Sequence, residues 1–139
     1  MRQDPVAAPR PARILVVEDE VVIAMDIKMQ LRKLGHIPVG HTTRGEQAVV
    51  LAGELRPDLV LMDIQLAGPM DGITAAQTLR DRFDLPTVFL SAFSGAGNRA
   101  RAELCQPAGY LTKPFFERDL ATVIAAFLDA GTAQGPAAP

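Results

Sequence analysis

Short apolar runs alternate with longer amphipathic stretches through the central part of the chain. Several runs are almost continuously apolar, as in strands of a parallel sheet that is covered by helices on both faces. The expected strands are 14–17, 37–40, 59–62, 87–90 and 109–111. The stretches between them have helical periodicity. The expected helices are about 20–34, 44–55, 71–83, 97–105 and 116–129.

The alternation predicts one α/β domain, doubly wound around a five-stranded parallel sheet in a (βα)5 arrangement. Pro57 and Pro86 precede strands, where they end the previous helix without removing a ladder hydrogen bond. The flanking segments 1–12 and 131–139 are rich in Pro, Ala or Gly and lack apolar periodicity. We therefore expect a flexible lead-in and a flexible tail around a single domain at 13–130.

Composition narrows the class of protein. The chain has 139 residues, 48% of them apolar, which suits one domain with a substantial core. The net charge is -2 and Lys and Arg form no dense run, which argues against a nucleic-acid surface. No apolar run approaches the roughly 20 residues of a membrane span, and no segment resembles a signal peptide. Cys105 is the only cysteine, which excludes an intrachain disulfide, and we expect a cytoplasmic protein.

Candidate chemistry lies where the expected strands end. In an open parallel sheet, ligands bind beyond the carboxyl ends of the strands. The residues at these ends are Glu18, Asp19 and Glu20, then Asp63, then Ser91, and finally Lys113. Each of them alone is an ordinary loop, cap or surface residue. Their coincidence at four strand ends indicates a binding site.

The types of these residues indicate phosphoryl chemistry. Clustered carboxylates repel one another unless a cation intervenes, and a small set of hard oxygen ligands suits Mg²⁺. Asp63 is the natural nucleophile, because a carboxylate can carry a phosphoryl group as an acyl phosphate. Lys113 can pair with one phosphoryl oxygen and Ser91 can hydrogen-bond another.

Together these residues resemble the receiver domain of two-component response regulators. The matching segments are ILVVEDE (14–20), DLVLMDIQL (58–66), DGI (71–73), TVFLSAF (87–93) and GYLTKPF (109–115). The resemblance covers about residues 13–129, and the set is far more specific than any single segment. It implies a flavodoxin-like fold with strand order 2-1-3-4-5.

The resemblance also implies roles around the metal. Asp63 matches the phosphoacceptor and Asp19 a direct ligand of Mg²⁺, for which Mn²⁺ is an expected substitute. Glu18 matches an acidic residue that reaches the metal through water. The main-chain carbonyl of Gln65 matches a further ligand.

Other positions match residues that read out and time the signal. Ser91 and Tyr110 match the switch hydroxyl and the switch aromatic, and Lys113 the phosphoryl-binding lysine. Gln65 and Phe93 match positions that tune dephosphorylation. The family usually has a cis peptide at this position, so the Lys113–Pro114 bond is a candidate cis bond, although only about 5–6% of X-Pro bonds in proteins are cis.

The chain departs from the family pattern after Asp63. Ala67 stands in place of the usual proline, and the stretch from Asp63 to 71–72 is one residue longer than the commonest pattern. We therefore expect a differently shaped loop at 67–70. Phe93 is bulky, so we hypothesise that it restricts the attacking water and lengthens the phosphorylated lifetime.

The implied partners are a sensor histidine kinase or a histidine phosphotransfer protein, and a separate downstream effector protein. A phosphorylation-dependent homodimer is a further expectation, whereas nucleic acid and membranes are not expected partners. The chain is expected to be a stand-alone regulator that catalyses only its own phosphorylation and dephosphorylation. Its output surface would be the helix at 97–105, the strand at 109–111 and the helix at 116–129. Any exposed apolar part of helix 20–34 would receive the kinase.

Three alternatives remain open. A phosphatase of the haloacid-dehalogenase type also uses a strand-end Asp with Mg²⁺, but it needs a second Asp where this chain has Gln65. Residues 95–100 match the dinucleotide pattern G-x-G-x-x-A, yet they follow the fourth strand and are better interpreted as a loop. The third alternative is a degenerate receiver that binds partners without phosphorylation. The presence of the acidic pair, Asp63 and Lys113 argues against it.

Overall fold

The computed structural model describes residues 11–92 and 96–137, with side chains for all of these except 96–98 and 131–137. Five strands alternate with five helices in this part of the chain. The strands are β1 (Arg13–Val17), β2 (Ile37–Thr42), β3 (Leu59–Asp63), β4 (Thr87–Ser91) and β5 (Gly109–Thr112). The helices are α1 (Val21–Lys33), α2 (Gly45–Leu55), α3 (Gly72–Phe83), α4 (Ala96–Glu103) and α5 (Glu117–Ala137).

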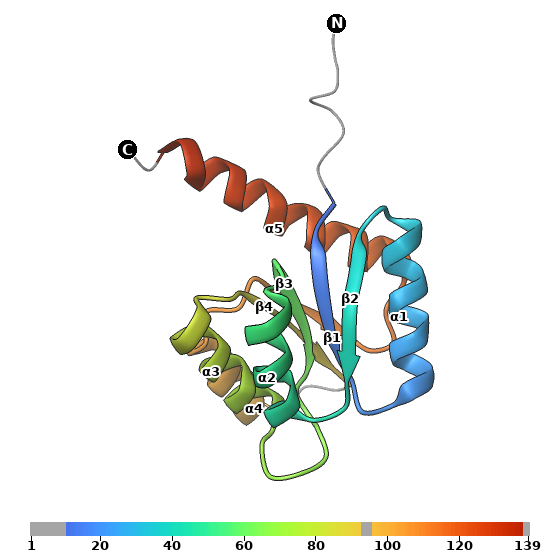
Figure 1. The fold of residues 1–139 in the computed structure, drawn as a ribbon, viewed down its shortest axis with the longest axis vertical. Coiled ribbons are helices and arrows are strands. Elements are labelled where there is room, and N and C mark those ends of the chain that lie inside the picture. Colours follow the sequence, from blue (N-terminus) through green and yellow to red (C-terminus); the bar gives the residue numbers. More distant parts are fainter. Residues whose placement is uncertain (1–10, 93–95, 138–139) are drawn as a thin grey trace, which may run out of the picture.

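The strands form one parallel sheet in the order β2-β1-β3-β4-β5, which confirms the predicted flavodoxin-like order (Figure 1). Because the order reverses direction after β1, the ends of β1 and β3 lie side by side at the centre of the sheet. Val17 pairs with Met62 and Asp63 with Leu90. The register therefore brings the residues after Val17 next to Asp63.

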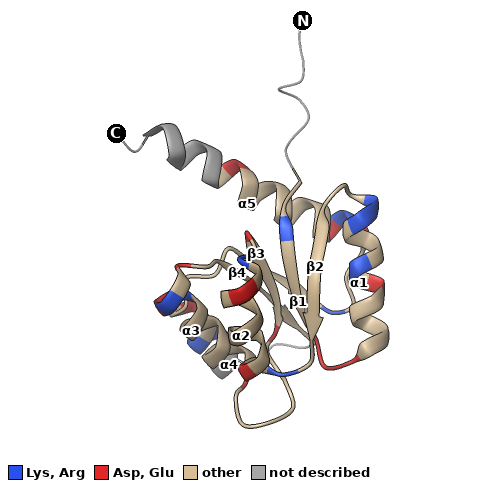
Figure 2. Cartoon of the chain, viewed as in Figure 1, with Lys and Arg blue, Asp and Glu red and all other residues tan. Residues whose placement is uncertain are grey.

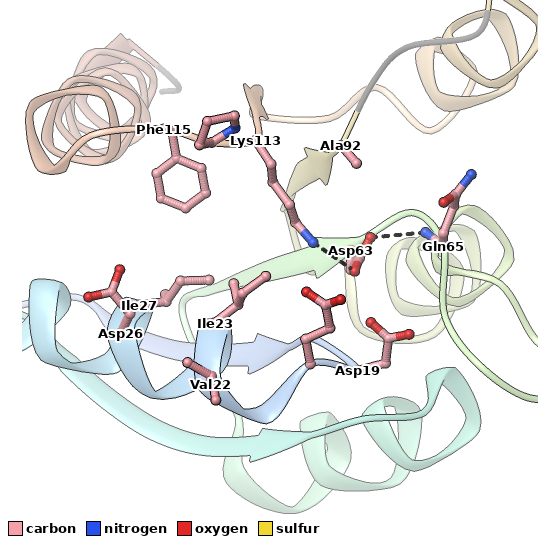
Figure 3. Close-up of a pocket in the computed structure, with 12 residues that line it drawn as sticks. Asp19, Val22, Ile23, Asp26, Ile27, Asp63, Gln65, Ala92, Lys113 and Phe115 are labelled. Atoms are coloured by element: carbon pink, nitrogen blue, oxygen red, sulfur yellow. Dashed lines mark hydrogen bonds and ion pairs between the residues drawn. The ribbon is translucent and has the colours of Figure 1, made fainter.

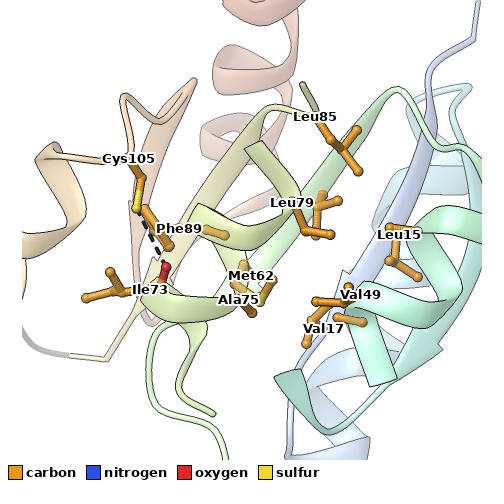
Figure 4. Close-up of a cluster of buried hydrophobic side chains, with 14 of the residues drawn as sticks. Leu15, Val17, Val49, Met62, Ile73, Ala75, Leu79, Leu85, Phe89 and Cys105 are labelled. Carbon is orange, nitrogen blue, oxygen red and sulfur yellow. Dashed lines mark hydrogen bonds between the residues drawn. The ribbon is translucent and has the colours of Figure 1, made fainter. Parts of the chain in front are cut away.

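Successive side chains of a strand point to opposite faces, and each face has its own core. On one face, α2, α3 and α4 cover Leu15, Met62 and Phe89 (Figure 4). On the other face, α1 and α5 cover Ile14, Leu61 and other fully buried strand residues. Cover on both faces explains why the central strands are almost continuously apolar.

Two helices differ from the prediction. Helix α4 begins at Ala96, one residue earlier than expected, so most of the segment 95–100 that was interpreted as a loop is helical. Helix α5 continues to Ala137 and includes residues 131–137, where the sequence pattern predicts a tail. Figure 1 shows the C-terminal part of α5 extending beyond the sheet. Residues 1–10 of the lead-in predicted at 1–12 lie outside the described residues.

Charge is distributed unevenly over the described residues. Figure 2 shows acidic residues in the loop between β1 and α1, and basic residues toward the C-terminal end of α1. Within the described ranges, no helix combines the length and the apolar character that crossing a membrane requires. The acidic loop lies at the edge where the strands end, and this edge contains the candidate site.

Candidate functional site

Three carboxylates converge at the carboxyl ends of β1 and β3. Glu18 and Asp19 follow β1, and Asp63 ends β3. Each can offer an oxygen such that all three atoms lie within 4.8 Å of one another. Glu18 is fully buried and Asp63 is 4% exposed, whereas Asp19 is open to solvent. The register of two neighbouring strands thus places two carboxyl groups inside the protein and one at its surface.

One ammonium group joins the two buried carboxylates. Lys113 Nζ lies 2.7 Å from Glu18 Oε1 and 3.0 Å from Asp63 Oδ2, and the contact to Asp63 is visible in Figure 3. The lysine follows β5, and its main-chain amide donates to the carbonyl of Ser91 at 2.7 Å. The Lys113–Pro114 peptide is cis, the isomer expected from the sequence. Strands β4 and β5 together therefore aim the lysine at Glu18 and Asp63.

The electrostatics of this cluster favour an added cation. Burial raises the pKa of Glu18 to about 7, with Lys113 opposing this shift and Asp63 adding to it. Burial opposes the charge on Lys113, but hydrogen bonds to Glu18 and Asp63 outweigh it and raise its pKa. Three carboxylates with one ammonium leave a surplus of negative charge in a partly dry site. Hard oxygen donors in this arrangement fit a divalent cation such as Mg²⁺.

The backbone around Asp63 is held from two directions. The amide of Gln65 donates to Asp63 Oδ1 at 3.0 Å, and the amide of Gly72 donates to the carbonyl of Ile64 at 2.9 Å. A Cβ atom at Gly72 would collide with the carbonyl oxygen of Asp63, so only glycine allows α3 to begin this close. Asp71 caps α3 by accepting from the Thr74 amide at 2.8 Å.

A cavity of about 770 Å³ opens over these groups. Its polar end contains Asp19, Asp63 and Lys113 (Figure 3). Its other end is lined by Ile23 and Phe115, among other apolar side chains. A ligand that fills the cavity therefore meets a charged cluster at one end, and at the other a largely apolar wall of α1 that also carries Asp26 (Figure 3).

The remaining predicted residues are distributed around the site. Gln65 lines the cavity with an exposed side chain, and Ser91 is partly exposed at the end of β4. Tyr110 is partly buried, with its ring centroid 6.0 Å from that of Phe89. Phe93 lies outside the described residues. The structure thus brings Glu18, Asp19, Asp63 and Lys113 together and leaves Tyr110 on the core side of the sheet.

Two nearby residues escaped the sequence analysis. His41, on β2, places Nε2 3.0 Å from the carbonyl of Glu18, and a carbonyl only accepts, so this nitrogen carries the proton. Arg99, on α4, lies with its guanidinium carbon 3.8 Å from the ring centroid of Tyr110. Neither has a signal in the sequence, because each contact joins segments that are distant along the chain.

Comparison with known families supplies an independent description. Residues 14–125 match the family model described as the response regulator receiver domain. The matched range includes the whole cavity lining and every strand of the sheet apart from the first residue of β1. It begins one residue after the start of β1 and ends within α5.

Curated proteins and solved structures agree with this match. The chain is 40% identical over 114 residues to the transcriptional regulatory protein PdtaR of Mycobacterium tuberculosis, covering 82% of this chain and 55% of PdtaR. It is 36% identical over 119 residues to the phyllosphere-induced regulator PhyR of Methylorubrum extorquens, covering 85% of this chain and 44% of PhyR. The chain therefore spans about half the length of these curated relatives.

Among solved structures, the signal receiver domain of a modulated diguanylate cyclase from Desulfovibrio desulfuricans superposes with a TM-score of 0.84 at 33% identity. That match covers 89% of this chain and 98% of the other. The anti-anti-sigma factor PhyR from Bartonella quintana superposes with a TM-score of 0.80 at 29% identity, and 54% of its length is covered.

Proposed function

Since this chain belongs to the response regulator receiver family, we propose that Asp63 accepts a phosphoryl group from a phosphohistidine. Membership implies a histidine kinase as partner and a domain that catalyses only its own phosphorylation chemistry. The observation that carries the proposal is the setting of the Asp63 carboxylate. One oxygen faces Lys113 Nζ at 3.0 Å, the other accepts from the Gln65 amide at 3.0 Å, and two further carboxylates lie within reach of a shared ion.

Receiver domains bind Mg²⁺, and the acidic cluster supports the same ion here. Asp19, Asp63 and the main-chain carbonyl of Gln65 would hold it, with Glu18 reached through water. When bound, the ion spreads the charge that develops on the phosphoryl oxygens. Mn²⁺ is an expected substitute, because carboxylate, carbonyl and water ligands suit both ions.

The residues of this chain have distinct tasks in the transfer. A carboxylate oxygen of Asp63 attacks phosphorus, so an O–P bond forms while the N–P bond to the donor imidazole breaks. The freed imidazole takes its proton from water. Lys113 gives up its contact with Asp63 to pair with a phosphoryl oxygen, and the Ser91 hydroxyl hydrogen-bonds another. Gln65 has no acidic proton, so its side chain cannot act as the general acid of a phosphatase.

An apolar face of α1 is the proposed docking surface for the histidine-bearing helices of the kinase. The buried half of α1 consists of Ala24, Ile27 and Leu31, which belong to the core. On the other half the side chains are more than half exposed, namely Val21, Val22, Met25 and Met29. Met25 lies three or four positions from each of the other three, so all four share one side of the helix.

Met25→Glu tests the docking surface. Kinase-dependent phosphorylation should fall by about tenfold or more, because a charge would be buried on docking. Phosphorylation by acetyl phosphate should not change, since it needs no docked protein. Val50→Glu, at a comparably exposed residue of α2, is the matched control. Equal loss from both donors would contradict a docking role.

Output is proposed to leave through α4, β5 and α5 toward a separate effector protein, with a phosphorylation-dependent homodimer as a second outcome. Phosphorylation adds about -1.5 to -2 charges and three acceptor oxygens at Asp63. Movement of Ser91 toward the phosphoryl group would free space for Tyr110 beside Phe89. Ser91→Ala and Tyr110→Phe are expected to weaken phosphorylation-dependent binding or dimerisation, measured by sedimentation with and without beryllofluoride. Unchanged association in both variants would contradict this route.

Gln65 and Phe93 are proposed to set the phosphorylated lifetime. Gln65 is exposed at the mouth of the cavity, where it can meet the hydrolytic water. Phe93→Ala is expected to shorten the half-life of the phosphorylated protein, because a smaller side chain admits water more easily. A decay rate equal to that of the unmodified chain would remove Phe93 from this role.

Mass spectrometry after incubation with acetyl phosphate and Mg²⁺ tests the central proposal. The unmodified chain should gain one phosphoryl group, and Asp63→Asn should gain none. Asp129→Asn, at an exposed aspartate of α5, should behave as the unmodified chain. A gain that survives in Asp63→Asn would place the acceptor elsewhere. No gain from acetyl phosphate or from any histidine kinase would leave the degenerate receiver as the better description.

We also propose that the receiver acts as a stand-alone protein. The endogenous protein should then have the 14.9 kDa mass of this chain. Detection with an antibody in the source cells measures that mass. A band of about twice the size would indicate a further domain, as in the longer relatives, and would overturn this part of the proposal.

A further inference from the structure

Two loops meet beside the candidate site. One joins β2 to α2, and the other joins β3 to α3 and directly follows Asp63. Arg44 and Ala67 form an isolated parallel bridge between them. A Cβ atom at Gly45 would lie 2.9 Å from the carbonyl oxygen of Met70, so the two backbones are in close contact. The loop after Asp63 therefore packs against the beginning of α2.

The side chain of Arg44 covers the middle of this loop. A Cβ atom at Gly68 would lie 2.7 Å from Arg44 Nη2 and 3.0 Å from its Cζ, so the guanidinium packs onto the glycine. Glu46 Oε2 accepts from Arg44 Nε at 2.8 Å and holds the planar group in this position. Gly68 has φ +93, a conformation that other residues rarely adopt, so neither a side chain nor a β-carbon competes for the space.

Away from its middle, the loop is held by hydrogen bonds near its ends and by the side chains of Leu66 and Met70, which pack against the core. At its start, Gln65 donates to Asp63, and at its end, Gly72 donates to Ile64. Between these points Ala67 and Gly68 are small and exposed, and they contribute no buried side chain. A segment with few buried contacts opens locally at low free energy unless something else restrains it. Leu66 and Met70 supply part of that restraint by packing against the core, and the backbone bridge from Arg44 to Ala67 adds to it. The guanidinium of Arg44 supplies the side-chain contact at Gly68 itself.

We propose that Arg44, held by Glu46, is a positioning residue for phosphoryl transfer. By fixing the loop at Gly68, it keeps the Gln65 backbone at Asp63, where the amide binds the carboxylate and the carbonyl would face the cation. This role rests on the proposed function, because that function requires the cation. The contact between Arg44 and Gly68 is independent of it. Arg44 acts through the backbone of the loop and touches no reacting atom.

The test compares Arg44→Ala, Arg44→Lys and the control Arg82→Ala, an exposed arginine of α3. Hydrogen exchange of residues 64–71 in Arg44→Ala should be about tenfold faster, while β1 and β4 stay protected. Mg²⁺ affinity, measured by titration calorimetry, should fall by about tenfold, as when a residue that supports a metal ligand is lost. Arg44→Lys keeps the charge but not the planar group, and should restore less than half of the lost affinity. Arg82→Ala should match the unmodified chain in both measurements.

Three outcomes would overturn the proposal. Unchanged exchange in the loop would show that Arg44 does not restrain it. Faster loop exchange with unchanged Mg²⁺ affinity would make Arg44 a structural residue only. Full recovery of affinity in Arg44→Lys would assign the effect to charge instead of packing. If the unmodified chain binds Mg²⁺ but gains no phosphoryl group, the proposed function fails, while these measurements still decide whether Arg44 positions the loop for cation binding.

Discussion

The edge of the sheet where the strands begin and the edge where they end differ in how their charged and polar groups are paired. Where the strands begin, the amides of Ala12 and of Arg13, the first residue of β1, are each matched by a single acceptor. Ala12 donates to His36 Nδ1 at 3.0 Å, and Arg13 donates to Asp58 Oδ2 at 2.8 Å. Where the strands end, three carboxylates compete for one ammonium group. The two amides at the first edge each have an acceptor, whereas the other edge retains a surplus of negative charge.

This difference separates stability from function. The matched hydrogen bonds of Ala12 and Arg13 contribute to folding and leave neither amide free for a ligand. Unbalanced carboxylates at the second edge oppose folding, but they bind any cation that relieves their repulsion. Trading stability for a reactive site is common in proteins. Removal of a carboxylate charge should therefore lower stability at the first edge and raise it at the second.

The largest effect is expected from Lys113→Met. The substitution leaves Glu18 and Asp63 without their shared cation, and removing one partner of a buried pair costs about 3 kcal/mol. Urea denaturation without Mg²⁺ measures the free energy of unfolding. Lys33→Met is the matched control, because the Lys33–Glu117 pair is exposed and should contribute less than about 1 kcal/mol. Similar losses in the two variants would contradict the special status of the second edge.

Asp58→Ala should have the next largest effect, at the edge where the strands begin. The amide of Arg13 would lose its acceptor, and an unsatisfied donor costs about 1.5 kcal/mol. Urea denaturation again measures the loss. Asp81→Ala, on the exposed side of α3, serves as a control. A neutral result at Asp58 would show that water replaces the carboxylate and that this edge is less closely matched than the geometry indicates.

Asp63→Asn should raise stability without Mg²⁺ by about 1 kcal/mol, because it removes repulsion with Glu18 and leaves Lys113 paired. Added Mg²⁺ should stabilise the unmodified chain and have little effect on the variant. Thermal unfolding with and without Mg²⁺ gives both quantities. Loss of stability in Asp63→Asn would mean that the buried carboxylate helps folding, and the contrast between the edges would fail.

The smallest effect concerns pH. Burial lowers the pKa of His36 from its ordinary value of 6.5, and its Nδ1 must be unprotonated to accept from Ala12. Its contribution to stability is therefore complete above pH 6.5 and is lost as pH falls through the lowered pKa. Unfolding free energies of the unmodified chain and His36→Ala, measured from pH 8 to pH 5, should converge toward low pH. A constant difference would exclude the titration of His36 as the cause.

Sequence reasoning was most successful where a local pattern decides the structure. The apolar runs located all five strands, since strand-length runs bounded by Pro57 or Pro86 leave little choice. The residues directly after these runs were Glu18, Asp19, Asp63 and Lys113, and parallel topology alone requires that they share one edge. The sequence alone therefore predicts that these residues meet at one edge of the sheet.

The errors lie where composition suggested irregular backbone. Gly, Ala and Pro near the C-terminus predicted a tail, but α5 continues through 131–137. The glycines near 95–97 similarly predicted a loop where α4 begins at Ala96. Helix propensity is a weak guide at such boundaries, because tertiary context and the preceding turns decide where a helix ends.

The sequence by itself determined the order of elements, the parallel sheet and the acidic edge, since each follows from a short period or from neighbours along the chain. Only the tertiary structure decided that Lys113 bridges Glu18 and Asp63, and that Arg44 lies on Gly68. It also decided which half of α1 is buried. These contacts join segments far apart in sequence, and their distances depend on strand register and loop packing, which no local pattern encodes.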